Sequence, residues 1–180
     1  MTFYQLAASA CIGLAVAACG GRDDDTTGAG ATTPVTVASP LVQLENSGAL
    51  PRLDRSASLA GPDANNNGVR DDIDDYINTK FTDPKQRAAV LQDARTMQKA
   101  VLVDPTNKEA SKAVSLEMMA AVNCVSSRFP DGQGLESASA IGAKIEAITT
   151  NTKPRLKAYL AFNKSQDGTA ISLPTGDTCE

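Results

Sequence analysis

Three prolines divide the chain after residue 70 into segments that can form helices. Pro84 and Pro105 both follow an aspartate, and Pro154 opens the last segment. Proline suits the first position of a helix, where the backbone N–H needs no helical partner, and it interrupts a helix elsewhere. Apolar residues recur every three or four positions between these breaks. We therefore expect an all-α fold, a small bundle of four to five helices, at about residues 71–80, 84–103, 105–128, 135–150 and 154–163.

The apolar stripes of these helices predict which residues form the core. Aromatic side chains are few, with four phenylalanines, three tyrosines and no tryptophan, so the core must consist mainly of aliphatic residues and methionine. The residues at helical spacing are Ile73, Tyr76, Ile77, Phe81, Val90, Ala94, Met97, Val101, Ala110, Val114, Met118, Ala121, Val125, Ala138, Ile141, Ile145, Ile148, Leu156, Tyr159 and Leu160.

Residues 63–74 read Asp-Ala-Asn-Asn-Asn-Gly-Val-Arg-Asp-Asp-Ile-Asp and supply oxygen atoms at a regular spacing. Oxygen-bearing side chains fall at positions 1, 3, 5, 9 and 12 of this stretch, and position 7 offers a backbone carbonyl. Gly68 at position 6 permits the sharp turn that would bring these oxygens to one centre. Hard cations such as Ca²⁺ take six to eight oxygen ligands. The predicted calcium ligands are Asp63, Asn65, Asn67, Val69 through its carbonyl, Asp71 and Asp74.

The spacing of residues 63–74 resembles the EF-hand loop, and more closely the dockerin and thrombospondin type 3 loops, which end on aspartate. Three features depart from the paired EF-hand: Arg70 stands at the usually apolar position 8, no second loop follows, and Gly61-Pro62 interrupts an incoming helix. The resemblance therefore implies a single loop that leads into one helix. We expect a structural site of the weak extracellular range, with a Kd on the order of 10⁻⁵ to 10⁻³ M.

A simple turn is the alternative interpretation of the same residues. The Asn/Gly stretch would then precede a helix whose acidic first turn, residues 71–75, only caps the helix and interacts with its dipole. Three carboxylates that converge on one point repel each other unless a cation lies between them. This repulsion favours the calcium site over the turn.

The first 18 residues contain no charged side chain and carry an apolar run from Leu6 to Ala18. This run is too short to span a bilayer and long enough for the core of a secretory signal. It ends in Val16-Ala17-Ala18-Cys19, which resembles the bacterial lipobox. The resemblance implies cleavage after residue 18, acylation of Cys19, and a lipoprotein of the outer membrane that faces the periplasm or the cell surface. Cys11 is a second candidate for acylation, and an ordinary signal peptide or an apolar first helix of the fold are the alternatives.

Residues 19–60 are rich in Gly, Thr, Ser, Ala and Pro, and their apolar residues are sparse. This composition is typical of a disordered, flexible tether between an anchor and a domain. We therefore expect three parts: a signal peptide at 1–18, a tether at 19–60, and a helical domain at 61–180 that begins with the calcium loop. The leucines between Leu41 and Leu53 offer the alternative of local docking on that domain.

The domain contains two cysteines, Cys124 and Cys179. In an oxidising compartment such a pair most simply forms a disulfide, which here would tie the irregular C-terminal tail to a helix. The alternative is a buried free thiol at Cys124 and an exposed one at Cys179. We expect the disulfide and the calcium loop to stabilise opposite ends of the domain.

The composition excludes most enzymatic chemistry. The chain has no histidine, which removes Ser-His-Asp and Cys-His systems, and it has neither a phosphate-binding P-loop nor a dinucleotide fingerprint. The net charge of −4 and the lack of a basic stripe argue against a nucleic-acid partner. We expect no enzyme but a lipid-anchored cell-envelope protein, with the membrane as partner through Cys19 and another envelope protein as a candidate partner. A small-ligand carrier with a pocket between helices and a carboxylate-dependent hydrolase are the alternatives.

Overall fold

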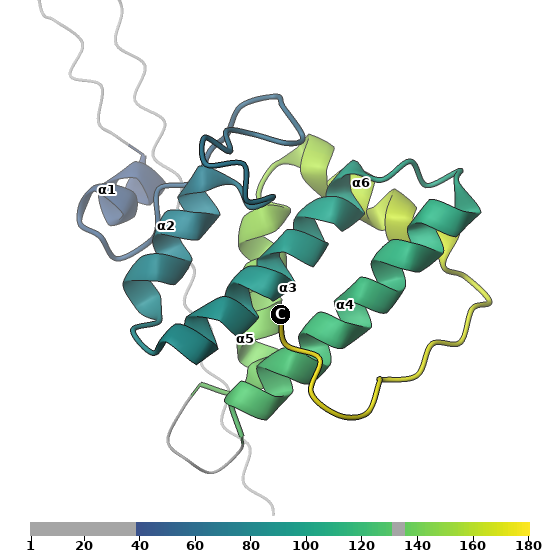
Figure 1. Ribbon diagram of the computed structural model, residues 1–180. Helices are drawn as coiled ribbons and strands as arrows, with labels where there is room; N and C mark the ends of the chain where they lie inside the picture. The colour runs from purple at the N-terminus through teal and green to yellow at the C-terminus, as the bar shows by residue number, and fades with distance from the viewer. Residues whose placement is uncertain (1–38, 131–135) are drawn as a thin grey trace, which may run out of the picture. The chain divides into compact units, whose positions relative to one another are not determined.

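The structure is a computed structural model that describes residues 39–130 and 136–180 (Figure 1). The described residues form helices and no strand, which confirms the all-α expectation. Residues 39–130 and 136–180 contain six helices instead of the expected four to five, because a short helix precedes the predicted calcium loop. The helices are α1 (Pro40–Asn46), α2 (Asp71–Lys80), α3 (Pro84–Leu102), α4 (Lys108–Arg128), α5 (Ala138–Thr149) and α6 (Lys153–Ser165).

Side-chain caps decide where the helices begin. Asp83 accepts hydrogen bonds from the backbone N–H groups of Lys85 and Gln86, each at 2.9 Å, and Pro84 opens α3 as predicted. Helix α4 begins three residues later than predicted. The carboxylate of Asp104 accepts from the backbone N–H and the hydroxyl of Thr106, so Pro105 lies in a turn before the helix.

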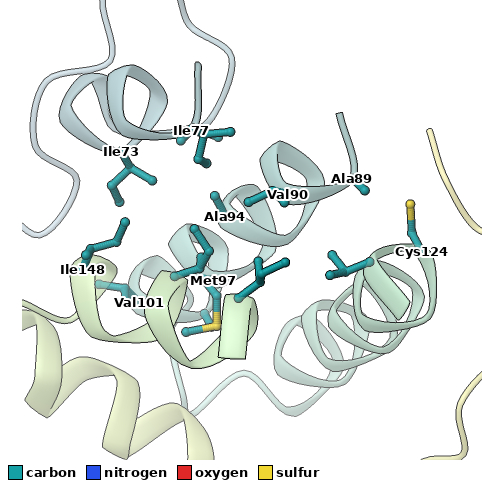
Figure 2. Packing of buried hydrophobic residues seen from close by; sticks show 14 of the residues in the cluster. Ile73, Ile77, Ala89, Val90, Ala94, Met97, Val101, Cys124 and Ile148 are labelled. Carbon is teal, nitrogen blue, oxygen red and sulfur yellow. The ribbon is translucent and has the colours of Figure 1, made fainter. Parts of the chain in front are cut away.

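Helix α3 is the centre of the bundle and packs against α2, α4, α5 and α6. The aliphatic core gathers along it, as predicted from the apolar stripes of α2 to α5. Figure 2 shows this cluster, which includes Ile73, Ile77, Ala89, Val90, Ala94, Met97, Val101, Cys124 and Ile148. Because α3 is covered on nearly all sides, its polar residues are buried as well, among them Gln92, Asp93, Thr96 and Gln98.

Of the apolar stripe predicted for α6, Tyr159 is buried as predicted, but the two leucines are not. Leu156 and Leu160 were expected in the core, but they point outward with 45% and 55% of their surface exposed. The buried residues of α6 are Arg155, Tyr159 and Phe162. Helix α6 therefore turns Arg155, and not its leucines, toward the bundle. The interior supplies the hydrogen-bond acceptors that a buried guanidinium requires.

The sequence predicts a flexible tether over residues 19–60, but residues 39–60 are part of the folded domain. Residues 40–46 form α1, and Leu53 and Leu59 pack against the core. Gln98 of α3 donates a 2.9 Å hydrogen bond to the carbonyl of Ala60, which holds this segment against the bundle. The described domain therefore starts before residue 61. Residues 1–38, with the predicted signal peptide and Cys19, lie outside the described residues.

None of the helices in the described parts of the chain is both long enough and apolar enough to cross a bilayer.

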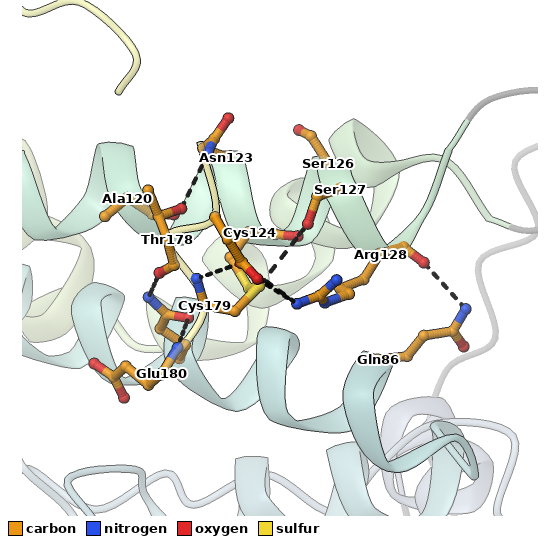
Figure 3. Close-up of a disulfide and its surroundings, with 12 residues drawn as sticks. Gln86, Ala120, Asn123, Cys124, Ser126, Ser127, Arg128, Thr178, Cys179 and Glu180 are labelled. Carbon is orange, nitrogen blue, oxygen red and sulfur yellow. Dashed lines mark hydrogen bonds and ion pairs between the residues drawn. A yellow bond between two sulfur atoms is a disulfide. The ribbon is translucent and has the colours of Figure 1, made fainter. Parts of the chain in front are cut away.

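Cys124 of α4 and Cys179 of the C-terminal tail form the predicted disulfide, with an S–S distance of 2.01 Å (Figure 3). Polar contacts hold the tail in place on both sides of the bridge. The Thr178 hydroxyl donates to the carbonyl of Ala120, and Gln92 of α3 donates to the carbonyl of Thr178 at 2.9 Å. The tail therefore lies over both α3 and α4.

Candidate metal centre

Residues 63–70 form a tight loop directly before α2, and residues 71–74 are the first turn of that helix. The N–H of Asp71 donates a 2.9 Å hydrogen bond to the carbonyl of Pro62, which joins the two ends of the loop. Within the loop, Asn66 and Gly68 have positive φ values of 55° and 79°. Both residue types tolerate this left-handed region, and Gly68 does so without steric cost. The turn predicted at position 6 is therefore present.

The carboxylate of Asp63 is turned into the loop. One of its oxygens accepts the N–H of Asn67 at 3.1 Å, and the other accepts the N–H of Gly68 at 2.9 Å. Across the loop, Oδ1 of Asp71 accepts the N–H of Ala64 at 2.9 Å. Each carboxylate thus fixes the backbone and keeps further lone pairs for another ligand.

Asp74 is the most buried of the five predicted side-chain ligands and accepts hydrogen bonds from three side-chain amides. Its Oδ2 accepts from Nδ2 of Asn65 at 2.8 Å and from Nδ2 of Asn67 at 3.0 Å. Its Oδ1 accepts from Nδ2 of Asn78, one turn later in α2, at 2.9 Å. The loop therefore brings Asn65, Asn67 and Asp74 together, as the sequence predicted.

The amides of Asn65 and Asn67 point their nitrogens at Asp74, while their oxygens accept the N–H groups of Asn67 and Val69. Half a turn of each amide would present the oxygens to a hard cation at the expense of these two backbone hydrogen bonds. Val69, whose carbonyl is the sixth predicted ligand, has a fully buried side chain, so its backbone is fixed. Within residues 39–130 and 136–180, no three carboxylate or thiolate groups lie close enough together to hold a metal by themselves. The carboxylates of Asp63, Asp71 and Asp74 therefore do not by themselves form the convergent set that the sequence led us to expect.

Arg70 anchors the loop to the bundle. Its side chain is fully buried, and it forms an ion pair with Asp72 in which Nη2 lies 2.9 Å from Oδ2. Nη2 also donates to the carbonyl of Ile148 at 3.0 Å, at the C-terminus of α5. Free carbonyls and the negative end of the helix dipole both favour a cation at this place.

A second buried guanidinium lies beside the first. Arg155 of α6 pairs with Asp54 at 2.5 Å and also donates to the backbone carbonyls of Asp54, Ser58 and Leu59. The hydrogen bond from Arg155 lowers the pKa of Asp54 to about 2. The backbone N–H of Asp54 in turn donates to Asp72 at 2.7 Å. These four side chains, Arg70, Asp72, Asp54 and Arg155, form one connected group that we call the double-arginine cluster.

Gly61 is required where the double-arginine cluster meets the loop. Its φ of +68° lies in the left-handed region, and a Cβ at this position would lie 2.3 Å from Cδ of Arg70 and 3.1 Å from Nη2 of Arg155. No side chain fits in this space without displacing both guanidinium groups. Gly61-Pro62, which the sequence suggested only as a helix break, is thus a close-contact point.

The sequence led us to expect the disulfide and the loop at opposite ends of the domain. This expectation is wrong, because one side chain contacts both the loop and the tail that carries the disulfide. Arg95 of α3 donates a 2.9 Å hydrogen bond from Nε to the carbonyl of Asn67, inside the loop. The same guanidinium forms an ion pair with Glu180, the residue after the bridged Cys179. Glu180 also donates its backbone N–H to Gln92. The tail and the loop are therefore joined through a single arginine.

Asp93, in the middle of α3, is a buried carboxyl group that the sequence did not single out. Only 6% of its surface is exposed, and no described residue donates a hydrogen bond to its carboxylate. Burial raises its pKa to about 6. It lines a small cavity of about 190 Å³ together with Val125 of α4 and Gly142 of α5. No contact within the described parts of the chain joins Asp93 to the loop, so it does not add an acid to the metal centre.

A larger groove, of about 690 Å³, lies beside the outer side of α2. Its lining mixes apolar side chains with charges of both signs, and it includes Glu45, Leu50, Arg52, Asp72, Tyr76 and Lys144. Such a lining differs from the mostly apolar pocket that binds a small organic molecule.

The sequence identified the loop because its ligand spacing is local, but it did not identify the groups that hold the loop in place. Arg70 was noted only as a departure from the motif, and Arg155 was not noted at all. Their partners are backbone carbonyls about 80 to 100 positions away, which carry no residue-type signal. Comparison with known family models, curated proteins and solved structures finds no match to this chain.

Proposed function

We propose that this chain is a non-enzymatic, lipid-anchored protein of the cell envelope with one structural calcium site. The observation that carries the calcium proposal is the gathering of Asn65, Asn67 and Asp74 in a loop whose backbone Asp63 already fixes. A bound Ca²⁺ would supply the positive charge that the loop carboxylates lack. It would be held by Asp63, Asn65, Asn67, the carbonyl of Val69, Asp71 and Asp74.

The structural role follows from where the loop is attached. Arg70 links the loop to the end of α5, and Arg95 links it to the disulfide-bonded tail. An ion that fixes residues 63–74 would therefore stabilise the first helix of the bundle, the α5 terminus and the tail together. For a Kd on the order of 10⁻⁵ to 10⁻³ M, binding to the folded form alone would add about 0.4–3 kcal/mol at millimolar calcium.

The location rests on the sequence at residues 16–19 and on the disulfide. A bridge between Cys124 and Cys179 is typical of an oxidising compartment outside the cytoplasm. An affinity in the weak extracellular range would keep the site loaded only where calcium is plentiful, which agrees with such a compartment. The domain would contact another envelope protein through its exposed surface.

Neither alternative function is favoured by a specific observation. A hydrolase would need a second acid beside the loop, and Asp93 lies elsewhere in the bundle. A carrier of apolar ligands would need an enclosed apolar cavity. The groove beside α2 carries charged side chains of both signs, and the cavity at Asp93 has a volume of only about 190 Å³.

Two measurements test the proposal. Melting curves with calcium and with EGTA should differ for the wild type, and the shift should disappear in Asp74→Asn. Asp75→Asn is the matched control, since Asp75 is the exposed neighbouring aspartate outside the predicted ligand set, and it should keep the shift. Mass spectrometry of the protein from bacterial membranes should show an acylated Cys19 as the first residue. A wild type that is insensitive to EGTA, or an unmodified Cys19, would contradict the corresponding half of the proposal.

A further inference from the structure

The outward side of α6 carries a stripe of lysines and leucines that the bundle does not use. It consists of Lys153, Leu156, Lys157, Leu160 and Lys164, all exposed, and we call it the α6 outer face. At 100° per residue these five positions lie within an arc of about 100° around the helix axis. The buried residues Arg155, Tyr159 and Phe162 lie on the opposite side.

This face is the basic part of an otherwise acidic chain. The chain carries a net charge of −4, yet no acidic residue occurs between Glu146 and Asp167. None of the three lysines of the face forms an ion pair with any residue that the structure describes, and what sets them apart from the other unpaired lysines is that they share one helix face with two exposed leucines. The positive charge of the α6 outer face is therefore available to a partner.

The two leucines indicate the chemistry of that partner. Leu156 and Leu160 lie one helical turn apart, and about half of each remains exposed to water. Lysines beside them can bury their apolar stems while the ammonium groups stay in a polar layer. A helix with basic residues and leucines on one exposed face suits the headgroup region of an anionic bilayer, where both kinds of side chain find their preferred surroundings.

We propose that the α6 outer face docks on a membrane surface rich in anionic phospholipid. The inference rests on the proposed envelope location for its biological meaning, but the contact itself needs neither acylation nor calcium. Only 19 residues lie between Cys19 and Ser39, where the described structure begins. A chain of that length extends at most about 65 Å, so an acylated Cys19 would keep the domain near the bilayer. The lysines then select the orientation in which the domain touches it.

Vesicle binding of the full chain with Cys19→Ser tests the proposal without the lipid anchor. The unacylated protein should bind phosphatidylcholine vesicles that contain phosphatidylglycerol more tightly than pure phosphatidylcholine vesicles, and high salt should weaken the difference. Each lysine near an anionic surface contributes roughly a fivefold factor at low salt. The triple variant Lys153→Gln, Lys157→Gln and Lys164→Gln should therefore lose roughly a hundredfold in the anionic preference.

A second triple variant controls for net charge and for the apolar N-terminus. Lys85, Lys112 and Lys144 are exposed on α3, α4 and α5, and their change to glutamine removes the same charge away from the face. This variant should keep most of the preference for anionic vesicles. Equal losses in the two triple variants, or equal wild-type binding to both kinds of vesicle, would overturn the proposal. Equal wild-type binding to both kinds of vesicle is also the result expected if the partner of the α6 outer face is an acidic protein.

Discussion

Arg95 and Asn67 connect the centre of the bundle to the candidate calcium loop: Nε of Arg95 lies 2.9 Å from the carbonyl oxygen of Asn67. The same arginine pairs with Glu180, which follows the disulfide-bonded Cys179. One guanidinium thus contacts both the loop and the tail, and we expect the order of the one to affect the order of the other. The domain therefore contains a short path from its disulfide to its proposed metal site.

Loss of the disulfide should weaken both the fold and calcium binding. The variant Cys124→Ala/Cys179→Ala frees the tail, which costs up to about 4 kcal/mol of unfolding free energy for a bridge that spans 55 residues. The freed Glu180 no longer orients Arg95, so the calcium Kd should rise severalfold. Arg95→Gln with the bridge intact should raise the Kd in a similar way at a smaller cost in stability. A Kd that is unchanged in both variants would show that the path carries no coupling.

Removal of Arg155 should destabilise the protein by about 3 kcal/mol, because it leaves Asp54 and several carbonyls without their donor. Chemical denaturation of Arg155→Met measures this loss. Lys153→Met, two residues earlier and exposed, should change stability by less than about 0.5 kcal/mol. The double variant Asp54→Asn/Arg155→Met should be less destabilised than the sum of the two single variants, and strict additivity would contradict a direct ion pair.

The Asp54–Arg155 pair also predicts an acid limit to stability. The pKa of Asp54 is lowered from 3.8 to about 2, so its charged form is the one that the folded state favours. The contribution of this group is present in full above about pH 4, and it is lost as the pH falls toward 2. Asp54→Asn should therefore show a weaker loss of stability in this pH window than the wild type. Identical slopes of unfolding free energy against pH would contradict this assignment.

Asp93 predicts the opposite dependence on pH. Burial raises its pKa from 3.8 to about 6, so the folded state binds more protons than the unfolded state between these two values. The contribution of this group is present below about pH 4 and is lost as the pH rises through 6. Asp93→Asn should remove this dependence and should stabilise the protein at pH 7.5 by about 1 kcal/mol relative to the wild type. Circular-dichroism melts across the pH range provide the test, and a variant that is less stable than the wild type at pH 7.5 would refute it.

Alanine variants of three glycines distinguish the energetic cost of a steric clash from the cost of a strained backbone. Gly61→Ala places a Cβ 2.3 Å from Arg70 at a positive φ, and it should cost more than about 3 kcal/mol. Gly168→Ala has a similar φ of +79° with open space around it, so it should show only the strain of about 1–2 kcal/mol. Gly142→Ala, in the interior of α5 with no atom nearby, should stabilise the protein by about 0.5–1 kcal/mol. Equal effects of the first two changes on the unfolding free energy would show that Gly61 is not a close-contact point.

The positions of most helices in this protein can be predicted from local sequence signals. The contacts that hold the helices and loops together cannot. The bounds of α2 and the start of α3 were predictable because apolar spacing, Asp83 and Pro84 act within a few residues. The pairing of Cys124 with Cys179 was predictable because no other cysteine lies in the domain. Helix α1 was missed because it has only seven residues and most of its apolar side chains face solvent.

The face of α6 shows why periodicity alone misleads. Leu156 and Leu160 repeat at helical spacing, so the sequence predicts them in the core, but the structure buries Arg155 and leaves the two leucines exposed. Which side of a helix is buried depends on what the rest of the chain presents to it. Here, the carbonyls of Asp54, Ser58 and Leu59 offer acceptors for a guanidinium, and no local pattern encodes that arrangement.

Calorimetric titration with calcium tests the central claim most directly. The wild type should show a single saturable transition with a Kd on the order of 10⁻⁵ to 10⁻³ M, and Asp63→Ala/Asp74→Ala should show none. Asp75→Ala, which changes an exposed aspartate of the same helix, should titrate like the wild type. A wild-type trace without saturable heat, equal to that of the double variant, would contradict the calcium site.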